Sequence, residues 1–206
     1  MSDVLYTIGH SNHAMEHFLT LLQQHGVKAV ADVRSQPYSS YLPQFSQAEL
    51  KRSLKMAGIA YVFLGKELGA RSDNKKCYLQ GKVQYDLLAQ EPLFVEGLDR
   101  VQRGMQTHTI ALMCAEKDPL ECHRAILVAR HLYERGISVS HILASGDLIT
   151  HAELEKNMLT MLKLAECNLL ESREEVLQRA YILQGGRIAY QADSGSSALT
   201  EQGMHP

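Results

Sequence analysis

Five short apolar runs, separated by segments with helical spacing, most constrain what this chain can fold into. The runs lie at 4–8, 27–33, 59–64, 109–113 and 138–143, and between the first two, Met15, Phe18 and Leu22 have helical spacing. Strands that alternate with helices form a parallel sheet covered on both faces. We therefore predict a three-layer, Rossmann-like α/β fold. Its mostly parallel five-stranded sheet would have the order 3-2-1-4-5, with extra helices at the C-terminal end.

The size of the chain fits one α/β domain over residues 1–191. It has 206 residues, of which 45% are hydrophobic. Strongly periodic helices at about 147–184 would pack on this domain, and they could supply the face of a homodimer. Gly, Ser, Ala and Gln dominate the end of the chain, so we predict a disordered tail at 192–206.

Charge and cysteine content narrow the class of protein. A net charge of -2 argues against a strongly basic nucleic-acid binder. No apolar stretch approaches the roughly 20 residues of a membrane span, so we expect no membrane contact. The first residues lack a signal-peptide pattern, and the four cysteines do not resemble a disulfide framework. We expect a cytoplasmic protein with reduced thiols.

The segment 114–124 carries the densest chemistry of the chain. It follows the fourth apolar run and includes two thiols, a carboxylate, an imidazole and a guanidinium. Asp118-Pro119 is typical of a helix start, with Asp118 as N-cap and Glu121 in capping-box spacing. A helix start offers free N–H groups to an anion. We therefore place the functional site here.

Polar residues also follow the first two strands of the predicted sheet. His10 and Ser11 come after the first strand, and Asp32, Arg34 and Ser35 end the second. Ligands of such sheets bind beyond the carboxyl ends of the strands, where the strand order reverses. We therefore expect these residues to meet the segment 114–124 at one edge of the sheet.

Four residues are candidates for catalysis: His10, Glu116, Cys114 and Cys122. His10 could act as general acid or base, with Glu116 or Asp32 orienting it. Cys122, beside His123 and Arg124 in the first turn of the predicted helix, has the setting of a low-pKa thiol. Packing roles for both cysteines are equally consistent with the sequence. The Cys-x5-Arg loop of thiol phosphatases is absent, because Leu120 stands where its arginine would be.

A second group is predicted to bind the ligand. Arg34, Arg71 and Arg124 could converge on a phosphate. We interpret Lys66 and Lys117 as solvated surface charges. Tyr38 could stack on a base or only pack within its loop. The ligand-binding candidates are Ser11, Asp32, Arg34, Ser35, Tyr38, His123 and Arg124.

We predict no cofactor and no metal. Zinc held by Cys114, Cys122, His123 and His10 is the alternative, since thiolate and imidazole suit that ion. The cysteine spacing, however, matches no C-x-x-C knuckle. The chain also lacks the GxGxxG, Walker A and GxSxG patterns, so dinucleotide, P-loop and hydrolase-elbow chemistry have no support.

Five ordered motifs resemble those of one family. They are Thr7-Ile-Gly-His-Ser11, Asp32-Val-Arg-Ser35, Leu64-Gly-Lys-Glu-Leu-Gly69, Leu112-Met-Cys-Ala-Glu116 and Glu121-Cys-His-Arg124. Over residues 4–150 the chain resembles the domain of unknown function 488 family of bacteria and archaea. Ala70 departs from a glycine that is frequent there, which concerns the shape of that loop. The resemblance implies an α/β fold and no settled reaction.

These features favour an enzyme that acts on a phosphate-bearing substrate, such as a nucleotide or a nucleic-acid component. The alternative is a non-catalytic module that binds nucleic acid or a nucleotide. Under it, the arginines and Tyr38 matter while the cysteines and Glu116 do not. A third possibility is a scaffold whose polar loop residues only brace one another.

Overall fold

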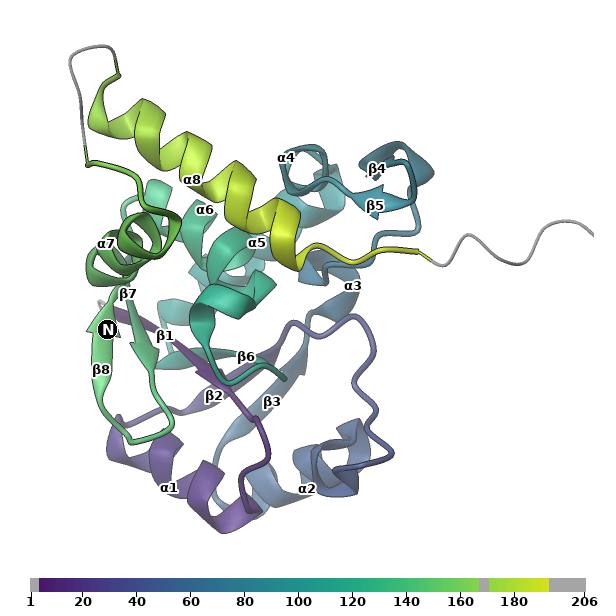
Figure 1. Ribbon diagram of the computed structural model, residues 1–206. Helices are drawn as coiled ribbons and strands as arrows, with labels where there is room; N and C mark the ends of the chain where they lie inside the picture. The colour runs from purple at the N-terminus through teal and green to yellow at the C-terminus, as the bar shows by residue number, and fades with distance from the viewer. Residues whose placement is uncertain (1–3, 167–170, 193–206) are drawn as a thin grey trace, which may run out of the picture.

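The centre of the molecule is a six-stranded, mostly parallel sheet (Figure 1). The computed structural model describes residues 4–166 and 171–192. The strands of this sheet are β1 (Val4–Gly9), β2 (Ala29–Asp32), β3 (Ala60–Phe63), β6 (Ile110–Cys114), β7 (Ser138–Ile142) and β8 (Leu148–Thr150). Their order is β3-β2-β6-β1-β7-β8, with β8 antiparallel to β7 and every other pair parallel. The predicted α/β class and mostly parallel sheet are thereby confirmed.

The predicted order 3-2-1-4-5, which numbers the strands along the chain, misplaces the fourth strand and lacks one strand of the sheet. The fourth predicted strand, β6, lies between β1 and β2 instead of outside β1. All five of its residues are buried, as suits a strand with neighbours on both edges and helices on both faces. The crossover from β1 to β2 leaves a gap one strand wide, and the long connection after β3 brings β6 back into it. The sixth strand, β8, extends the edge beside β7.

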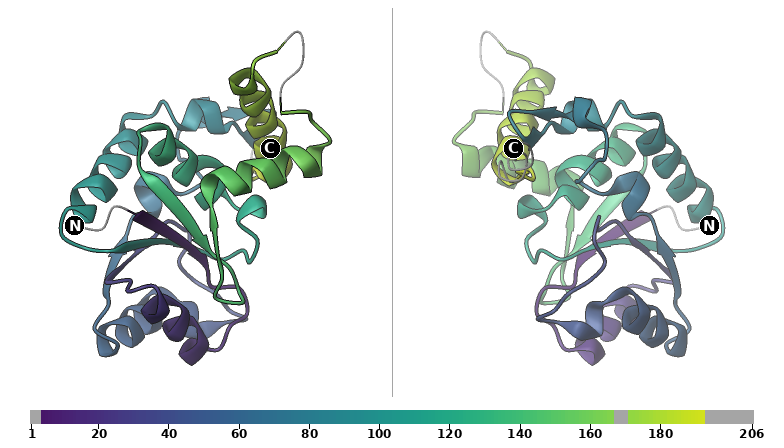
Figure 2. Two further views of the ribbon diagram at one scale, coloured as in Figure 1. Left: turned by 90° about the vertical axis from the view of Figure 1, so that its left-hand side faces the viewer. Right: turned by 90° about the vertical axis from the view of Figure 1, so that its right-hand side faces the viewer.

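Helices cover both faces of this sheet (Figure 2). The helices are α1 (Met15–Gln24), α2 (Gln47–Met56), α3 (Gly65–Leu68), α4 (Tyr85–Leu88), α5 (Pro92–Met105), α6 (Arg130–Glu134), α7 (His151–Leu162) and α8 (Arg173–Ile188). Short 3₁₀ turns lie at Pro43–Phe45, Lys75–Cys77 and Pro119–Glu121, and a π-helical segment, Arg124–Ala129, leads into α6. Helices α1 and α2 lie on one face, and α3, α5 and α6 lie on the other, with α7 and α8 beyond them (Figure 1).

The core has one part on each face of the sheet and a third under the C-terminal helices. Phe18 and Leu54 fill the side of α1 and α2. Phe94 and Leu98 of α5 fill the opposite side. Met158 of α7 and Val176 of α8 pack against the π-helical segment. The apolar periodicity of these helices therefore marks the faces that they bury.

A chain of buried hydrogen bonds ties α7 and α8 to the sheet. His141 of β7 accepts from Thr7 Oγ1 of β1 at 2.8 Å, and its Nε2 lies 3.0 Å from His151 Nδ1. His151 Nε2 lies 2.9 Å from Tyr181 Oη, which donates to Glu155 at 3.1 Å. Each neutral imidazole can accept at one nitrogen and donate at the other, so the whole chain is satisfied without charge on either histidine.

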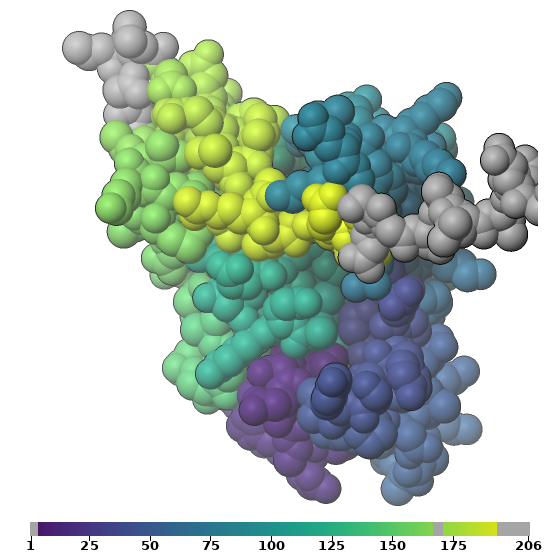
Figure 3. Space-filling view, turned by 45° about the vertical axis from the view of Figure 1, so that its right-hand side comes forward, coloured from purple at the N-terminus to yellow at the C-terminus, as the bar shows by residue number. Residues whose placement is uncertain are grey.

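The C-terminal part of the described chain crosses back over the molecule. The helices predicted at about 147–184 are found as α7 and α8, while Leu148–Thr150 forms β8. After α8, Tyr190 accepts from the Val83 N–H group at 3.0 Å, beside the small hairpin of β4 (Tyr78–Leu79) and β5 (Lys82–Val83). Figure 3 shows this yellow segment lying against the dark teal one. The predicted tail lies outside the described residues except for its first residue, Ala192.

Among the residues that the structure describes, no helix combines the length and the apolar character that a membrane crossing needs.

Candidate functional site

Three strand ends meet at the last residue of β6. The N–H group of His10, just after β1, donates to the carbonyl of Cys114 at 2.9 Å. On the other edge of β6, the N–H group of Val33, just after β2, donates to the carbonyl of Met113 at 3.1 Å. Because β6 lies between β1 and β2, its polar end is flanked by the polar ends of both. The expected meeting of these three segments is therefore found, with β6 in the middle.

The loop after β6 places two further functional side chains. Asp118 Oδ1 accepts from the Leu120 N–H group at 2.8 Å, as predicted for a capping aspartate, but only the single turn Pro119–Glu121 follows. Cys122 has extended backbone and interrupts the helix. Its carbonyl then accepts from Ala125 and Ile126 at 3.1 Å each, so the longer helix begins after Cys122 instead of at Asp118.

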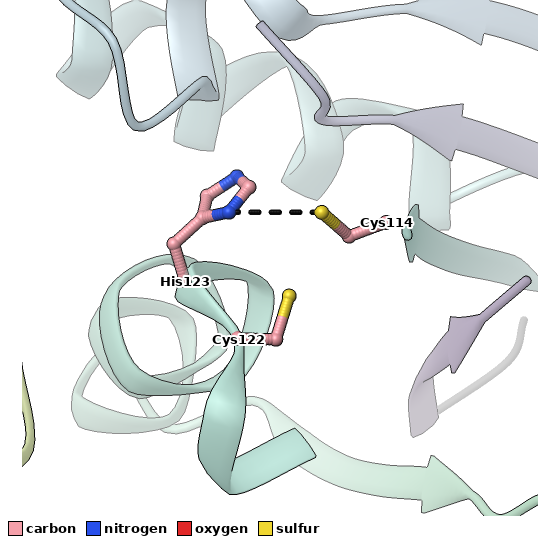
Figure 4. A group of neighbouring side chains, drawn as sticks. All are labelled: Cys114, Cys122 and His123. Carbon is pink, nitrogen blue, oxygen red and sulfur yellow. Dashed lines mark hydrogen bonds between the residues drawn. The ribbon is translucent and has the colours of Figure 1, made fainter. Parts of the chain in front are cut away.

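Cys114, Cys122 and His123 form a compact group, here called the thiol cluster (Figure 4). Cys114 Sγ lies 3.6 Å from His123 Nδ1. His123 Nε2 donates to the Val33 carbonyl at 3.0 Å, which orients the ring and leaves Nδ1 facing the sulfur atoms. All three side chains are buried, although His123 comes from the loop and Cys114 from the sheet. The fold thus brings a thiol from each of two elements to one imidazole.

The two sulfur atoms differ in their readiness to ionise. Burial, together with the neighbouring Cys122, raises the pKa of Cys114 well above its ordinary value. Burial acts in the same sense on Cys122, but the hydrogen bond from Cys114 and the charge of Arg124 outweigh it and bring that pKa well below its ordinary value. Two thiolates this close would repel each other, so one proton remains on Cys114. Cys122 is therefore the more acidic thiol of the pair.

Glu116 is hydrogen-bonded to Cys122. The Cys122 thiol lies 2.9 Å from Glu116 Oε2 and donates to it in its neutral form. Although much of the Glu116 side chain is exposed, partial burial of its carboxyl group and the nearby Cys122 sulfur raise its pKa. The lowered pKa of Cys122 and the raised pKa of Glu116 bring these two groups closer in acidity than a free thiol and a free carboxyl group. The positive charge of Arg124 contributes to the low pKa of Cys122.

A cavity of about 330 Å³ opens beside the thiol cluster. Cys114, Glu116 and His123 form part of its wall, and Arg34, Ser35 and Tyr38 from the segment after β2 form another part. The remaining lining residues are Gln36, Ala70, Arg71, Tyr85, Ala115, Glu121, Ile188 and Tyr190. Its volume is at the lower end of the roughly 300–1,000 Å³ of typical ligand sites. Six of the predicted site residues therefore face one cavity.

Asp32 and His10 lie behind this cavity and hold Arg34. Asp32 accepts from Arg34 Nε at 2.9 Å and Nη2 at 2.7 Å, and Arg34 Nη2 also donates to the Phe45 carbonyl at 2.9 Å. His10 Nδ1 donates to the Ser11 carbonyl at 2.8 Å, while its Nε2 accepts from Arg34 Nη1 at 3.2 Å. Burial and the charge of Arg34 lower the pKa of His10 to about 4. Both ring nitrogens are thus engaged inside the fold.

Arg124 also points into the protein. It is fully buried, and its Nη atoms donate to the carbonyls of Glu116 at 2.7 Å and Lys117 at 3.2 Å. It fixes the loop that bears Glu116 and supplies positive charge beside the cluster. Neither Arg124 nor Ser11 is among the residues that line the cavity.

Gly9 permits the close approach of this loop, because a Cβ atom there would lie 1.8 Å from the Glu116 carbonyl oxygen. Gly9→Ala is therefore expected to displace Glu116 and to lower the free energy of unfolding by about 1–3 kcal/mol. Gly186→Ala is the matched control, since nothing lies within 4 Å of that Cβ and α8 is helical there. Chemical denaturation checks both variants. Equal stability of the two would contradict this account of Gly9.

Sequence reasoning named Arg71 as a possible phosphate-binding residue without including it among the site candidates, and it missed Tyr190. The Arg71 guanidinium lies 4.3 Å from the centre of the Tyr190 ring, and its Nη1 donates to Gln36 at 3.1 Å. Its N–H group donates to Ser35 Oγ at 3.0 Å, which joins the loop after α3 to the loop after β2. Arg71 follows directly on the motif at 64–69, and that position was the available signal. Tyr190 is far away in sequence and joins the cavity only through the path of the chain after α8.

Comparison with known proteins gives a family and nothing closer. Neither the curated proteins nor the solved structures include a match to this chain. A family model matches residues 14–131, more than half of the 206 residues, and this range includes β2, β6 and the thiol cluster. The chain therefore belongs to the family described as domain of unknown function DUF488.

Proposed function

We propose that this protein is an enzyme that acts on a phosphate-bearing substrate, a nucleotide or a nucleic-acid component, in the cavity beside the thiol cluster. One observation carries the proposal: Cys114, His123 and Glu116 line the same cavity as Arg71 and the tyrosines. A cavity that only filled space would not need an acid–base carboxyl group next to two thiols. Titratable groups with shifted pKa values in a cleft are typical of catalytic sites.

The binding half of the proposal rests on Arg71 and three tyrosines. Arg34 uses four of its five side-chain N–H groups on Asp32, Phe45 and His10, whereas Arg71 donates through one side-chain bond, to Gln36, so Arg71 has more donors for an anion. Tyr38 is 75% exposed at the rim, and Tyr85 and Tyr190 line the wall. Aromatic rings stack on bases with little dependence on sequence. A phosphate on Arg71 with a base against a tyrosine is the arrangement that these side chains favour.

The chemical half rests on Glu116 and the cluster. Glu116 has a raised pKa and is hydrogen-bonded to the Cys122 thiol, so it suits the role of general acid and base. Cys114 and His123 lie in the cavity wall, whereas Cys122, the more acidic thiol, is not among the lining residues. His10, enclosed behind Arg34, acts as a positioning residue in this arrangement.

Nucleotide binding to the purified protein tests the proposal. A nucleoside monophosphate should raise the melting temperature, and the nucleoside without phosphate should raise it less. Arg71→Ala should weaken binding roughly 10–100-fold, which corresponds to the loss of a charge-assisted hydrogen bond of about 1.5–3 kcal/mol. Arg52→Ala is the control, because Arg52 pairs with Glu49 on exposed α2, away from the cavity.

Turnover separates an enzyme from a binding module. Conversion of a bound nucleotide, followed by chromatography, should be lost in Glu116→Gln while binding is retained. Binding that needs Arg71, with no conversion in the wild-type protein, would replace the enzyme by a non-catalytic nucleotide-binding module. Absence of binding to any nucleotide or single-stranded oligonucleotide would overturn both.

A further inference from the structure

We propose that Cys114, Cys122 and His123 bind one Zn²⁺ ion, whose fourth coordination position opens to the cavity. The donor atoms of these three side chains, two sulfurs and one imidazole nitrogen, all lie within 4.8 Å of one another. Among the described residues, this is the one group of His, Cys, Asp and Glu side chains close enough to share an ion. His10, which the sequence suggested as a fourth ligand, is not part of it.

The spacing of the donor atoms fits tetrahedral zinc. With Zn–S of about 2.3 Å and Zn–N of about 2.0 Å, tetrahedral angles put a sulfur and a nitrogen ligand about 3.5 Å apart. Cys114 Sγ and His123 Nδ1 are 3.6 Å apart. This pair could therefore bind the ion with little movement. Thiolate and imidazole together also favour zinc over magnesium or calcium.

The groups behind the ligands match those of a metal site. The bond from His123 Nε2 to the Val33 carbonyl leaves Nδ1 as the nitrogen that can bind the ion. Ligating histidines usually donate their other nitrogen in this way. The Arg124 N–H group approaches Cys122 Sγ at 3.5 Å, which stabilises negative charge on that sulfur. Both supports come from the backbone and hold the ligands in place.

A bound Zn²⁺ ion would also remove the repulsion between the two buried thiolates. Two buried thiolates repel each other, but with Zn²⁺ between them both can ionise, since a bound metal deprotonates thiols outright. The two negative sulfurs then cancel the charge of the ion.

Three protein ligands and an open position are typical of catalytic zinc. Cys114 and His123 line the cavity, so a water molecule on the ion would face the substrate. Glu116, whose Oε2 lies 2.9 Å from Cys122 Sγ, stands beside that position. In a hydrolytic step, Glu116 takes a proton from the water, and the hydroxide bonds to the electrophilic atom of the substrate. The leaving group departs with its bonding electrons and receives the proton from Glu116. Only this step rests on the proposed function; binding of the ion does not.

Metal titration of the full chain tests the site. After removal of metal with a chelator, Co²⁺ should bind with one equivalent and give the charge-transfer absorption of thiolate ligands, and Zn²⁺ should abolish this absorption. Cys114→Ser should weaken binding more than about 100-fold, beyond the effect of losing an outer-shell partner. Cys77→Ser is the matched control, since Cys77 is a buried thiol outside the cluster.

A measurement on the wild-type protein covers the case in which Cys114→Ser does not fold. Zinc should protect Cys114 and Cys122 from alkylation, read by mass spectrometry, and leave the reactivity of Cys77 unchanged. Cobalt binding without thiolate absorption, or equal alkylation with and without zinc, would overturn the metal site. Nucleotide binding is measured separately, so a failure here leaves the proposed substrate class standing, with the metal-free thiols as the catalytic groups.

Discussion

Replacing Asp32 with asparagine should lower the free energy of unfolding by about 3–5 kcal/mol, the usual cost of removing one partner of a buried ion pair. Asp32 is fully buried and receives Arg34 through two side-chain bonds, while the hydroxyl of Tyr61 donates to it at 2.9 Å. Asparagine keeps the shape but leaves the buried guanidinium without a counter-charge. Urea denaturation measures the loss.

Glu49→Gln is the control for that experiment. Glu49 also pairs with an arginine, Arg52, but both side chains are at least half exposed on α2. Exposed pairs contribute about 0–1 kcal/mol. Equal losses in the two variants would show that burial does not set the strength of the Asp32–Arg34 pair.

Stability should fall steeply as the pH drops below about 6.5, because three histidines are buried in neutral form. Burial lowers the pKa of His151 to about 4, burial and Arg34 do the same for His10, and burial with the neighbouring His151 lowers that of His141 well below its ordinary value. Above pH 6.5 these groups are neutral in both states. Below pH 6.5, these histidines bind protons in the unfolded chain but stay neutral in the folded chain. Each of them therefore lowers the free energy of unfolding by about 1.4 kcal/mol per pH unit.

His151→Gln separates this effect from general acid sensitivity. The variant should be less stable at pH 7.5, since the chain from His141 to Tyr181 is broken, yet its stability should depend less steeply on pH. The expected difference in slope is about 1.4 kcal/mol per unit between pH 6.5 and 5. Near the lower end, Glu155, whose pKa is raised by burial, offsets part of the loss. Identical slopes in variant and wild type would refute the assignment to His151.

The elements of the fold could be read from the sequence better than their arrangement. The apolar pattern marked the five principal strands. Each of them is an apolar run of similar length, and such a run does not indicate which strand lies beside it in the sheet. The position of β6 depends on the path of the long connection after β3, which a local pattern does not contain. The strand order was therefore mistaken although the strands themselves were found.

Capping patterns show the same limit on a smaller scale. Ser46 and Glu49 have capping-box spacing, yet the Ser46 hydroxyl donates to the Ser39 carbonyl at 3.4 Å and no box forms. Thr150 with Glu153, and Ser172 with Glu175, have the same spacing and do form boxes. Ser39, which lies outside the four-residue capping pattern, competes for the Ser46 hydroxyl, so the pattern alone cannot decide the outcome.

The site was predictable in place and less so in detail. Strand ends gave Cys114, Glu116 and Arg34, because polar residues follow apolar runs there. The inward turn of Arg124 could not be foreseen, since its partners are backbone carbonyls that every loop possesses. Arg71 was named from the sequence as a possible phosphate-binding residue, but its place beside Ser35 and Gln36 in the cavity wall depends on how two loops meet after folding.

The cavity wall includes Ile188 and Tyr190, which come after the residues matched by the family model. The cluster and Glu116 lie wholly within the matched residues. The groups suited to chemistry and part of the rim that shapes the opening thus belong to different stretches of the chain. Under the proposed function, a change confined to this C-terminal segment would alter the shape of the molecules that the cavity admits and leave Glu116 and the thiol cluster as they are.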